Sequence, residues 1–439
     1  MSQQSRYKRL ISLLAAGSLP FIAQPVWSAG FALSEQNASG LGTSYAGAGS
    51  IAEDASTGYY NAAGLTRLGE EQIVGSAVWI LPNSTLTATS ATANIASPTT
   101  GRVIPLGAGS TSTDADAIAP GLHYAKRIDD CWVFGLSVAS PFGLKTKYPN
   151  DSIARYMATR SDLKTIDIGP SIAYNWNGFS IGVGADALYL VAKLDSRIGL
   201  GNVNTDGLTE STASNWGLGY HAGVLYEFTD CTRIGLSYRS QVKVNPRGET
   251  INQFLAAGLP ETRYGLRSKI TLPDSVLLSA YHAFNEQWAV MADVQWMHWS
   301  LFKTLPLNLY DGTKALYKQY YRNTVRASLG GSYQWNDQVR LRLGTAYDKT
   351  PTQDTYRSIR IPDERRYWAS VGAQYRFTKC FAIDVGYAHL FFKKAKINET
   401  APALVQAGSA QSRQGLQTFN GTSKGRADLI GIQLTWDFV

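Results

Sequence analysis

Apolar and polar side chains alternate with a period of two along many stretches of this chain. Between residues 430 and 438 every second residue is apolar, and Gly, Gln, Thr and Asp occupy the positions between them. The stretches 338–348 and 288–299 alternate in the same way. A period of two places successive side chains on opposite faces of a β-strand. The pattern predicts long strands with one apolar face, aromatic at its ends, and one face of small, polar and charged residues.

Six short polar segments separate pairs of these strands. Each follows an aromatic strand end and contains Asp, Asn, Gly or Thr, which are residues that close β-hairpins. The six turns lie near 128–131, 175–178, 228–231, 284–287, 335–338 and 377–380. Six such turns predict seven hairpins and therefore fourteen strands, the first beginning near Gln72.

Longer segments connect the strands at their other ends. They lie near 89–113, 143–160, 195–214, 247–266, 303–320, 349–362 and 395–423. Short turns at one end and long loops at the other are typical of outer-membrane β-barrels, in which closure of the sheet pairs every backbone group. A soluble β-sandwich is the alternative, but its turns would recur at about every 8–12 residues. The fold class expected is an all-β membrane protein, a 14-stranded antiparallel barrel.

Composition and charge agree with an exported membrane protein. Residues 1–28 begin with cations and continue with a short apolar run and small residues, so they are predicted to be a signal peptide. No later apolar run is long enough for a helical membrane span. The 24 Tyr and 11 Trp suit aromatic girdles. The net charge of +8 is spread along the chain without a Lys/Arg cluster, which argues against nucleic acid as a partner.

Residues 29–70 depart from the strand pattern. This segment is rich in Gly, Ala and Ser and has neither the strand nor the helix period. Because a fourteen-strand barrel is wide enough to hold an aqueous pore, we expect 29–70 to form a hatch inside the barrel 71–439. Arginines of the wall are expected to bind hatch acids; the candidates are Arg326, Arg340, Arg342 and Arg376 on the wall and Glu53 and Asp54 in the hatch.

Several motifs along the chain carry a family resemblance. They are "AGFALSEQNASGLGTSYAGAGSIAEDAS" (29–56), "SPFGL" (140–144), "SYRSQVKVNPRG" (237–248), "RSIRIPDERRYW" (357–368) and "AKIN" (395–398). In this order they are similar to the hatch, the bend of the third strand, and strand and loop signatures of one family. The chain resembles, from end to end, the outer-membrane long-chain fatty-acid transporters, the FadL family, which also includes aromatic-hydrocarbon channels.

The resemblance implies a function and a location. Substrate would land in a groove among outer loops, pass to a site inside the barrel, and leave sideways through a gap at the kinked third strand. Long-chain fatty acids are the expected substrate, and aromatic or alkane hydrocarbons are the alternative. The expected location is the outer membrane of a Gram-negative bacterium, with both termini periplasmic. Outer-membrane lipid and the barrel-assembly machinery would be its partners, and it would be a monomer.

The expected gate is the hatch tip Asn61-Ala62-Ala63. The family has Asn-Pro-Ala at this place, next to the bend of strand three, and Ala62 replaces the proline here. Alanine neither fixes φ nor removes an N–H, so this tip is expected to be less rigid. Asn61 could instead be an ordinary turn residue.

The expected lateral opening is Ser140-Pro141-Phe142-Gly143. Proline cannot donate a ladder hydrogen bond, and glycine tolerates unusual backbone angles. A plain strand end that runs into an outer loop would have the same sequence.

The outer loop near 251–260 contributes the expected landing groove. Phe254, Leu255 and Leu259 are apolar where a solvated loop would be polar, although they could also pack against one another. A fatty-acid carboxylate needs a cation. The candidates near the outer half are Arg197, Lys314, Lys318 and Arg322.

Cysteine and histidine give no sign of a metal site, a cofactor or catalysis. Cys131, Cys231 and Cys380 follow three different turns, too far apart for a disulfide, so three free thiols are expected. The histidines fall on different predicted strands without a paired acid and nucleophile at the rim; they are His123, His221, His282, His298 and His389. We therefore expect a channel and not an enzyme. A general porin is the remaining alternative, and it would need a loop constriction and no N-terminal plug.

Overall fold

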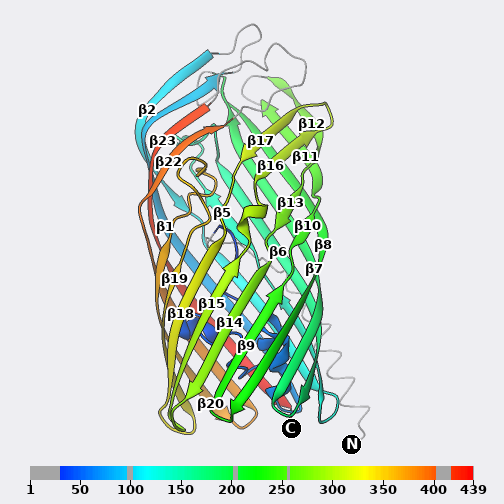
Figure 1. The fold of residues 1–439 in the computed structure, drawn as a ribbon. Helices are drawn as coiled ribbons and strands as arrows, with labels where there is room; N and C mark the ends of the chain where they lie inside the picture. Colours follow the sequence, from blue (N-terminus) through cyan, green and yellow to red (C-terminus); the bar gives the residue numbers. More distant parts are fainter. Residues whose placement is uncertain (1–29, 96–101, 201–205, 255–257, 402–416, 439) are drawn as a thin grey trace, which may run out of the picture.

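Antiparallel strands close into a barrel in the computed structural model (Figure 1). The structure describes residues 30–95, 102–200, 206–254, 258–401 and 417–438. β1 pairs with β3 along one edge and with β23 along the other, from Glu71↔Phe438 upward, so the first and last strands close the sheet. Within these ranges, no helix combines the length and the apolar character needed to cross a membrane.

The wall has fourteen strands, and several of them are interrupted. In chain order they are β1 (Glu71–Ile95); β2 and β3 (Arg102–Asp114, Ala117–Arg127); β4 and β5 (Trp132–Ala139, Gly143–Lys147); β6 (Arg160–Trp176); β7 (Phe179–Ile198); β8 (Gly207–Thr229); β9, β10 and β11 (Thr232–Arg239, Val242–Val244, Arg247–Phe254); β12, β13 and β14 (Leu259–Arg267, Ile270–Leu272, Ser275–Ala283); β15 and β16 (Trp288–Met297, Thr304–Leu309); β17 and β18 (Lys314–Lys318, Thr324–Gln334); β19 (Val339–Asp348); β20 (Arg366–Thr378); β21 and β22 (Phe381–Phe392, Ala395–Ala401); and β23 (Gln417–Phe438).

The strand count and the six turns predicted from the pattern are confirmed. The six short turns join β3 to β4, β6 to β7, β8 to β9, β14 to β15, β18 to β19 and β20 to β21. The first strand begins at Glu71, one residue before the expected Gln72. Cys131, Cys231 and Cys380 are free in the structure and lie at three of these turns.

The two faces of the wall differ as the alternation predicts. On β23, Ile432 and Trp436 are about half exposed on the outside (52% and 49%), whereas Gln433 is fully buried on the inside. The exposed apolar side chains continue around the barrel, which is the outward face that a barrel in lipid requires. The inward face carries polar and small residues that contact other parts of the chain.

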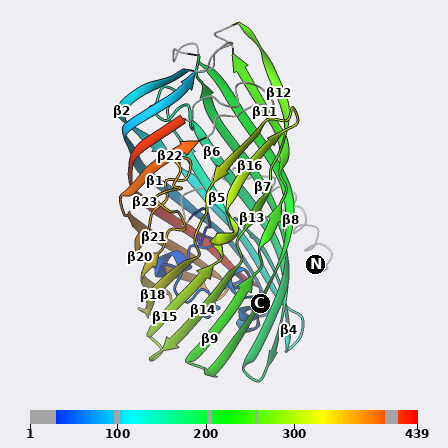
Figure 2. The same cartoon turned by 45° about the horizontal axis from the view of Figure 1, so that its top comes forward.

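Residues 30–70, the N-terminal segment, lie inside the lower part of the wall (blue in Figures 1 and 2). They form three short helical turns, η1 (Gly40–Thr43), α2 (Thr57–Tyr60) and η2 (Ala62–Arg67); a further turn, η4 (Trp299–Leu301), follows β15. The predicted need for small residues has a direct cause. A Cβ on Gly42 would come within 2.9 Å of the Gly372 backbone on β20, so only glycine allows this approach.

Polar contacts attach the N-terminal segment to the wall. Arg340 and Arg342 on β19 bind the Glu53 carboxylate at 2.6 and 2.8 Å, as predicted. Asp54 differs from the prediction, because it accepts hydrogen bonds from Ser39 and from Gln433 on β23. The other two predicted arginines bind elsewhere. Arg326 donates to the carbonyl of Ser44, and Arg376 pairs with Asp437 at 3.7 Å.

Candidate functional site

The third wall strand is interrupted where the sequence predicts a kink. β4 ends at Ala139 and β5 begins at Gly143. Both parts remain paired with β6, and between them the Thr165 hydroxyl bonds the N–H and the carbonyl of Phe142, at 2.9 and 2.7 Å. Pro141 has no N–H to offer a ladder. The backbone groups of strand three that face strand four therefore remain hydrogen-bonded across the interruption.

The other edge of strand three separates from its neighbour. β3 pairs with β4 only as far as Leu122↔Val138, and Ala117–Gly121 have no ladder partner on this side among the described residues. Farther along, the Lys147 N–H donates to the Thr113 hydroxyl at 3.2 Å, so contact resumes. We call the stretch between these two contacts the strand-three break.

N-terminal residues occupy the edge that β3 leaves at this break. The Leu33 N–H donates to the Pro141 carbonyl, and the Gly143 N–H donates to the Phe31 carbonyl, both at 2.8 Å. Backbone groups within a bilayer must be paired inside the protein. Residues 31–33 therefore act as a short substitute strand where the wall ladder is open.

Gln36 fastens this substitute strand on both sides of the break. Its side chain accepts from the Ser140 N–H at 2.8 Å and donates to the Ser140 carbonyl at 3.0 Å. Its own carbonyl accepts from the Ser76 hydroxyl on β1 at 3.0 Å and from His123 on β3 at 3.2 Å. The sequence reasoning missed Phe31–Gln36, since nothing local in them indicates a partner more than 100 residues away.

An aromatic cluster surrounds Phe31 above the break. Its ring centroid lies 4.7 Å from that of Trp299, 5.3 Å from Phe302 and 6.1 Å from Phe142, and Tyr321 packs behind the first two. Phe31 and Trp299 are almost fully buried. This cluster separates an upper cavity from a lower cavity, the lower one being nearer the short turns.

The upper cavity is apolar and encloses about 830 Å³, part of it open to solvent. Phe31 lies at one end of it. Its apolar lining comes from several wall strands, among them β5, β6, β7, β12, β13 and β16; it includes Leu144, Leu163, Ala192, Leu194, Leu266, Ile270, Leu305 and Leu307. Polar groups are few; they include Ser161, Asp162, Gln319 and Arg360. An apolar wall with few polar groups is typical of sites for small apolar ligands.

Arg360 is the cation that borders this cavity. It belongs to the segment 349–365 between β19 and β20, and its side chain is buried. Its guanidinium donates to the Arg160 carbonyl at 2.9 Å and to the Ser161 hydroxyl at 3.1 Å. The sequence analysis singled out the motif around Arg360 as a family signature but did not assign this residue to the site.

The four cations predicted from the sequence do not line the upper cavity. Lys314 and Lys318 on β17, and Arg322 after it, are exposed, whereas the intervening Tyr317 and Gln319 face the cavity. Arg197 on β7 is half-buried, and its Nε has no hydrogen-bond partner in the described part of the chain. Their assignment as carboxylate ligands thus stays a prediction, for a contact outside this cavity.

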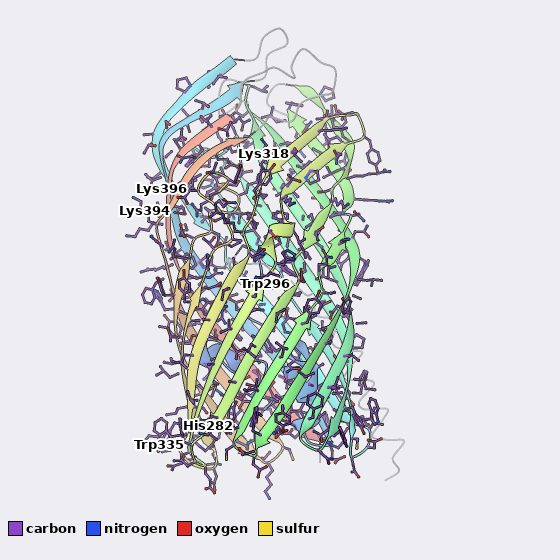
Figure 3. All side chains as sticks on the ribbon, viewed as in Figure 1. His282, Trp296, Lys318, Trp335, Lys394 and Lys396 are labelled. Carbon is purple, nitrogen blue, oxygen red and sulfur yellow. The ribbon has the colours of Figure 1, made fainter. Side chains whose placement is uncertain are left out.

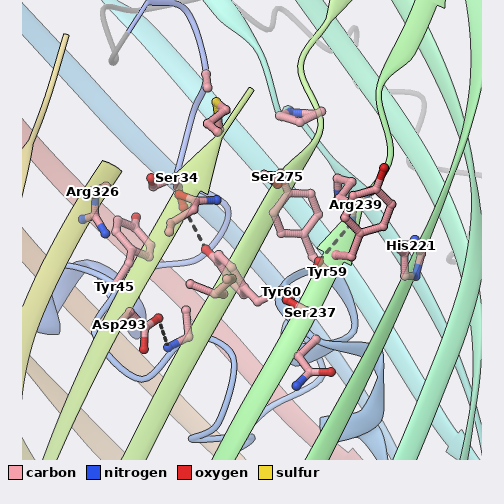
Figure 4. A pocket seen from close by; sticks show the side chains of 18 of the residues that line it. Ser34, Tyr45, Tyr59, Tyr60, His221, Ser237, Arg239, Ser275, Asp293 and Arg326 are labelled. Carbon is pink, nitrogen blue, oxygen red and sulfur yellow. Dashed lines mark hydrogen bonds between the residues drawn. The ribbon is translucent and has the colours of Figure 1, made fainter. Parts of the chain in front are cut away.

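The lower cavity, of about 840 Å³, lies between the N-terminal segment and the wall (Figure 4). Tyr59 and Tyr60 of α2 project into it, and Arg239, Asp293 and Arg326 face it from the wall. It is more polar than the upper cavity. Pro141 and Phe142 also line it, so this cavity reaches the strand-three break.

The predicted gate residues contact wall strands other than strand three. Asn61 donates from Nδ2 to the Gly49 carbonyl at 2.8 Å and to the Val224 carbonyl on β8 at 3.0 Å, and its Oδ1 accepts from the Ala63 N–H. Ala62 packs against Gly182 on β7. Asn61 and Ala62 also line the lower cavity together with Pro141 and Phe142, whereas residues 31–36 bond to the break directly. The role of Asn61-Ala62-Ala63 as the gate beside the kink stays a prediction.

A network of buried polar side chains extends over four neighbouring wall strands beside the lower cavity. His221 bonds Asp186 and Ser171, each at 2.9 Å, and Arg239 bridges Asp186 to the Tyr59 carbonyl. No local sequence pattern indicates this grouping, because its members lie on four strands. Ser171 is buried and does not line the cavity, so this arrangement anchors α2 and does not present a nucleophile to substrate.

The predicted landing groove is described only in part. Phe254 ends β11 and its backbone pairs with that of Leu259 on β12, and its ring lies against Gly207. Leu255 lies outside the described residues. The groove stays a prediction.

Comparison with known proteins agrees with this architecture. The family model described as outer membrane protein transport protein (OMPP1/FadL/TodX) matches residues 19–438. A long-chain fatty acid transport protein from Escherichia coli O6:H1 is 31% identical over the full length of both chains. Outer membrane protein P1 of Haemophilus influenzae is 31% identical over 97% of this chain and 99% of its own.

Solved structures share the fold. A Pseudomonas aeruginosa FadL homologue superposes with a TM-score of 0.82, at 23% identity, over 94% of this chain and all of that one. The Ralstonia pickettii toluene transporter TbuX gives a TM-score of 0.63, at 18% identity, over 90% and 98%. With the family model and the full-length relatives, these findings show that the chain belongs to the outer membrane transport protein family OMPP1/FadL/TodX.

Proposed function

We propose that this protein is an outer-membrane channel for the passive uptake of long-chain fatty acids. The observation that carries the proposal is the upper cavity, whose long apolar wall meets a buried cation, Arg360, at one edge. An apolar tail and a carboxylate head fit such a site. Two relatives that match almost the full chain are both 31% identical to it, and one of them is named a long-chain fatty acid transport protein. This name supports the proposed substrate class.

The route proposed runs from the outer loops to the upper cavity, past Phe31 to the lower cavity, and out through the strand-three break. A sideways exit suits an amphiphile, because each CH₂ returned from water to hydrocarbon contributes about 0.8 kcal/mol. The loops near Phe254 would supply the first contact, with exposed cations such as Lys314 and Lys318 near the entrance.

The N-terminal segment is the gate in this proposal. Two backbone hydrogen bonds hold residues 31–33 at the break, and each such bond contributes only about 0.5–1.5 kcal/mol net. Burial of the Phe31 ring adds about 1.5–3 kcal/mol to the closed state, so a displaced state costs several kcal/mol that a bound substrate would have to offset. A substrate that fills the upper cavity beside Phe31 could shift this equilibrium by its differential affinity. A general porin would have no such segment.

The proposal also fixes an orientation. The end with the short turns, where Phe438 of β23 lies, would face the periplasm, and the long connections would face outward (Figure 1). The protein would be folded by the barrel-assembly machinery and work as a monomer in outer-membrane lipid.

The test uses Arg360→Gln, which keeps a donor but removes the charge. We expect the purified variant to bind a long-chain fatty acid about tenfold more weakly, the loss of roughly 1.4 kcal/mol. The matched control is Arg365→Gln, an exposed arginine of the same segment, which should bind as the unmodified protein does. Binding is measured by quenching of tryptophan fluorescence in detergent. Unchanged affinity of a folded Arg360→Gln variant would refute the assignment of the carboxylate.

Uptake of aromatic or alkane hydrocarbons is the second candidate function. The guanidinium of Arg360 already has protein acceptors in the Arg160 carbonyl, the Ser161 hydroxyl and the Asp195 carbonyl, which favours a ligand without a charged head. Toluene and a long-chain alkane are therefore measured beside the fatty acid. Tighter binding of the hydrocarbons, with no response to Arg360→Gln, would decide for this candidate.

A further inference from the structure

The outward face of β23 changes character partway along the strand. From the short-turn end it presents Trp436, Leu434, Ile432 and Ile430, and it then presents Asp428, Arg426 and Lys424. β1 changes at the same level, because Trp79 pairs with Ile430, whereas the polar Asn83 and Thr85 pair with Arg426 and Lys424. This level marks the end of the apolar band on the side of the long connections.

An irregularity between β21 and β22 concentrates lysines at this level. The register along β23 shifts by one residue between Phe391↔Arg426 and Ala395↔Ser423. The chain from β21 to β22 therefore has one residue more than β23 over this stretch. An extra residue of this kind lets two neighbouring side chains emerge on one face. Lys393 and Lys394 are both exposed here, beside Lys424.

The resulting basic patch consists of five exposed cations on the outer wall (Figure 3 labels two of them). They are Lys393, Lys394, Lys396, Lys424 and Arg426. None of the five forms an ion pair with another described residue, and the nearest outward acid, Asp428, already accepts from Tyr387 and His389. Like charges on neighbouring strands repel, so this arrangement costs free energy unless an anion lies among them.

Aromatic side chains border the patch on the side of the apolar band. Tyr367, Tyr387 and Phe391 are exposed at 53%, 41% and 54%, and Tyr367 and Phe391 form a cross-strand pair. Such residues mark the interface between lipid headgroups and hydrocarbon. The patch therefore lies at headgroup level, directly above surface that contacts acyl chains.

We propose that the basic patch binds a phosphorylated glycolipid of the outer leaflet, of the lipid A class. Its phosphates would lie among the lysines, which bind phosphate as point charges, and its acyl chains would lie along Ile430 and Ile432. A free anion would gain the charge contacts but not the apolar ones, which is why the site is assigned to a lipid. The proposal needs the outer-membrane location and is independent of the transported substrate.

The test compares two triple variants of the full mature protein in detergent. Lys393→Gln/Lys394→Gln/Lys424→Gln removes the centre of the patch, and Lys243→Gln/Lys269→Gln/Lys303→Gln removes three exposed lysines from strands seven to nine. Purified bis-phosphorylated lipid A is titrated, and bound lipid is counted by native mass spectrometry. We expect the patch variant to bind at least about tenfold more weakly and the control variant to bind normally. Heat-dependent mobility on gels confirms that both are folded.

Two further probes separate the sources of binding. Lipid A without its phosphates should bind the unmodified protein as weakly as intact lipid A binds the patch variant. Inorganic phosphate at the same concentration should not displace the lipid. Equal binding of lipid A to the two triple variants, equal binding of the dephosphorylated lipid, or displacement by inorganic phosphate would each overturn the proposal.

Discussion

Glu35 is a carboxyl whose chemistry depends on the tertiary structure around it. It lies in the N-terminal segment between Leu33 and Gln36, only 1% exposed, and its Oε2 has no hydrogen-bond partner in the described part of the chain. Burial raises the pKa of Glu35 to about 7, against the opposing effect of the Arg366 and Arg326 charges. Glu35 thus titrates close to neutral pH, two residues after the substitute strand of the proposed gate.

Closure of the gate should therefore depend on pH. The closed segment holds a proton on Glu35 that the open segment, with an ordinary carboxyl pKa near 4.5, releases. The closed state then loses stability as pH rises from about 4.5 to about 7, by up to roughly 3 kcal/mol, and changes no further above that range. Hydrogen exchange of the amides of residues 31–36, corrected for intrinsic rates, should show faster opening at pH 8 than at pH 5.

Two variants isolate the effect of this carboxyl. Glu35→Gln should make the opening of residues 31–36 independent of pH in this range. Glu70→Gln, an exposed carboxyl of the same segment, should retain the dependence. The same pH slope in Glu35→Gln as in the unmodified protein would assign the effect to another group.

At the scale of the element, strand three combines an intact edge with an open one. Leu144 and Thr146 of β5 point inward, and Gly143, Lys145 and Lys147 share the opposite face. Lys145 reaches the Asp116 carbonyl on the neighbouring strand at 2.9 Å. A side chain at position 143 would consequently lie on the face opposite Leu144 and Thr146, where β5 begins at the strand-three break.

Bulk at this position should block the proposed exit. We expect Gly143→Trp to lower uptake of a long-chain fatty acid by about tenfold or more, because an indole in a confined passage costs at least about 1.4 kcal/mol. Uptake is measured in cells that carry folded, heat-modifiable barrel. The matched control is Gly75→Trp on β1, where a Cβ would meet nothing within 4 Å.

A variant of Asn61 provides a second test of the proposed gate. Asn61→Ala removes the hydrogen bonds to the Gly49 and Val224 carbonyls and should change apolar uptake without opening an aqueous pore. Normal uptake by a folded Gly143→Trp variant, together with no effect of Asn61→Ala, would defeat the lateral-exit hypothesis.

At the scale of the whole molecule, the N-terminal segment and the segment 349–365 fill the interior of the barrel. The N-terminal segment bonds to wall strands around the circumference; these contacts include Gln72 on β1, Val224 on β8, Asp293 on β15 and Gln433 on β23. Above it, the segment 349–365 folds inward and buries Arg357 and Ile359. An empty barrel of fourteen strands would conduct water and small solutes.

Deletion of residues 30–68 should convert the channel into a pore. The deletion removes Phe31 between the two cavities, so we expect ion conductance in planar bilayers and faster entry of small sugars into liposomes. Asn61→Ala should show neither. A folded deletion variant without conductance would mean that the segment 349–365 and the loops close the barrel by themselves.

The sequence by itself determined the strands, their number and the turns between them. A period of two and a turn signal are local, so both can be read without knowing which strands meet. Composition alone set residues 29–70 apart from the strand pattern and predicted a hatch, because a segment packed against the inside of a barrel needs small and polar residues. The Glu53 partners followed from charge, since a buried carboxylate requires a cation and the wall face of β19 offers Arg340 and Arg342.

Only the tertiary structure decided which residues form the candidate site. Whether a β17 side chain faces the cavity depends on register, because a shift of one residue exchanges the faces, and so Tyr317 lines it whereas Lys318 does not. Arg360 reaches the cavity only through the inward course of its segment. Phe31 meets the strand-three break because β3 parts from strand three there. Contacts between residues more than 100 positions apart depend on barrel closure, and no local pattern carries that information.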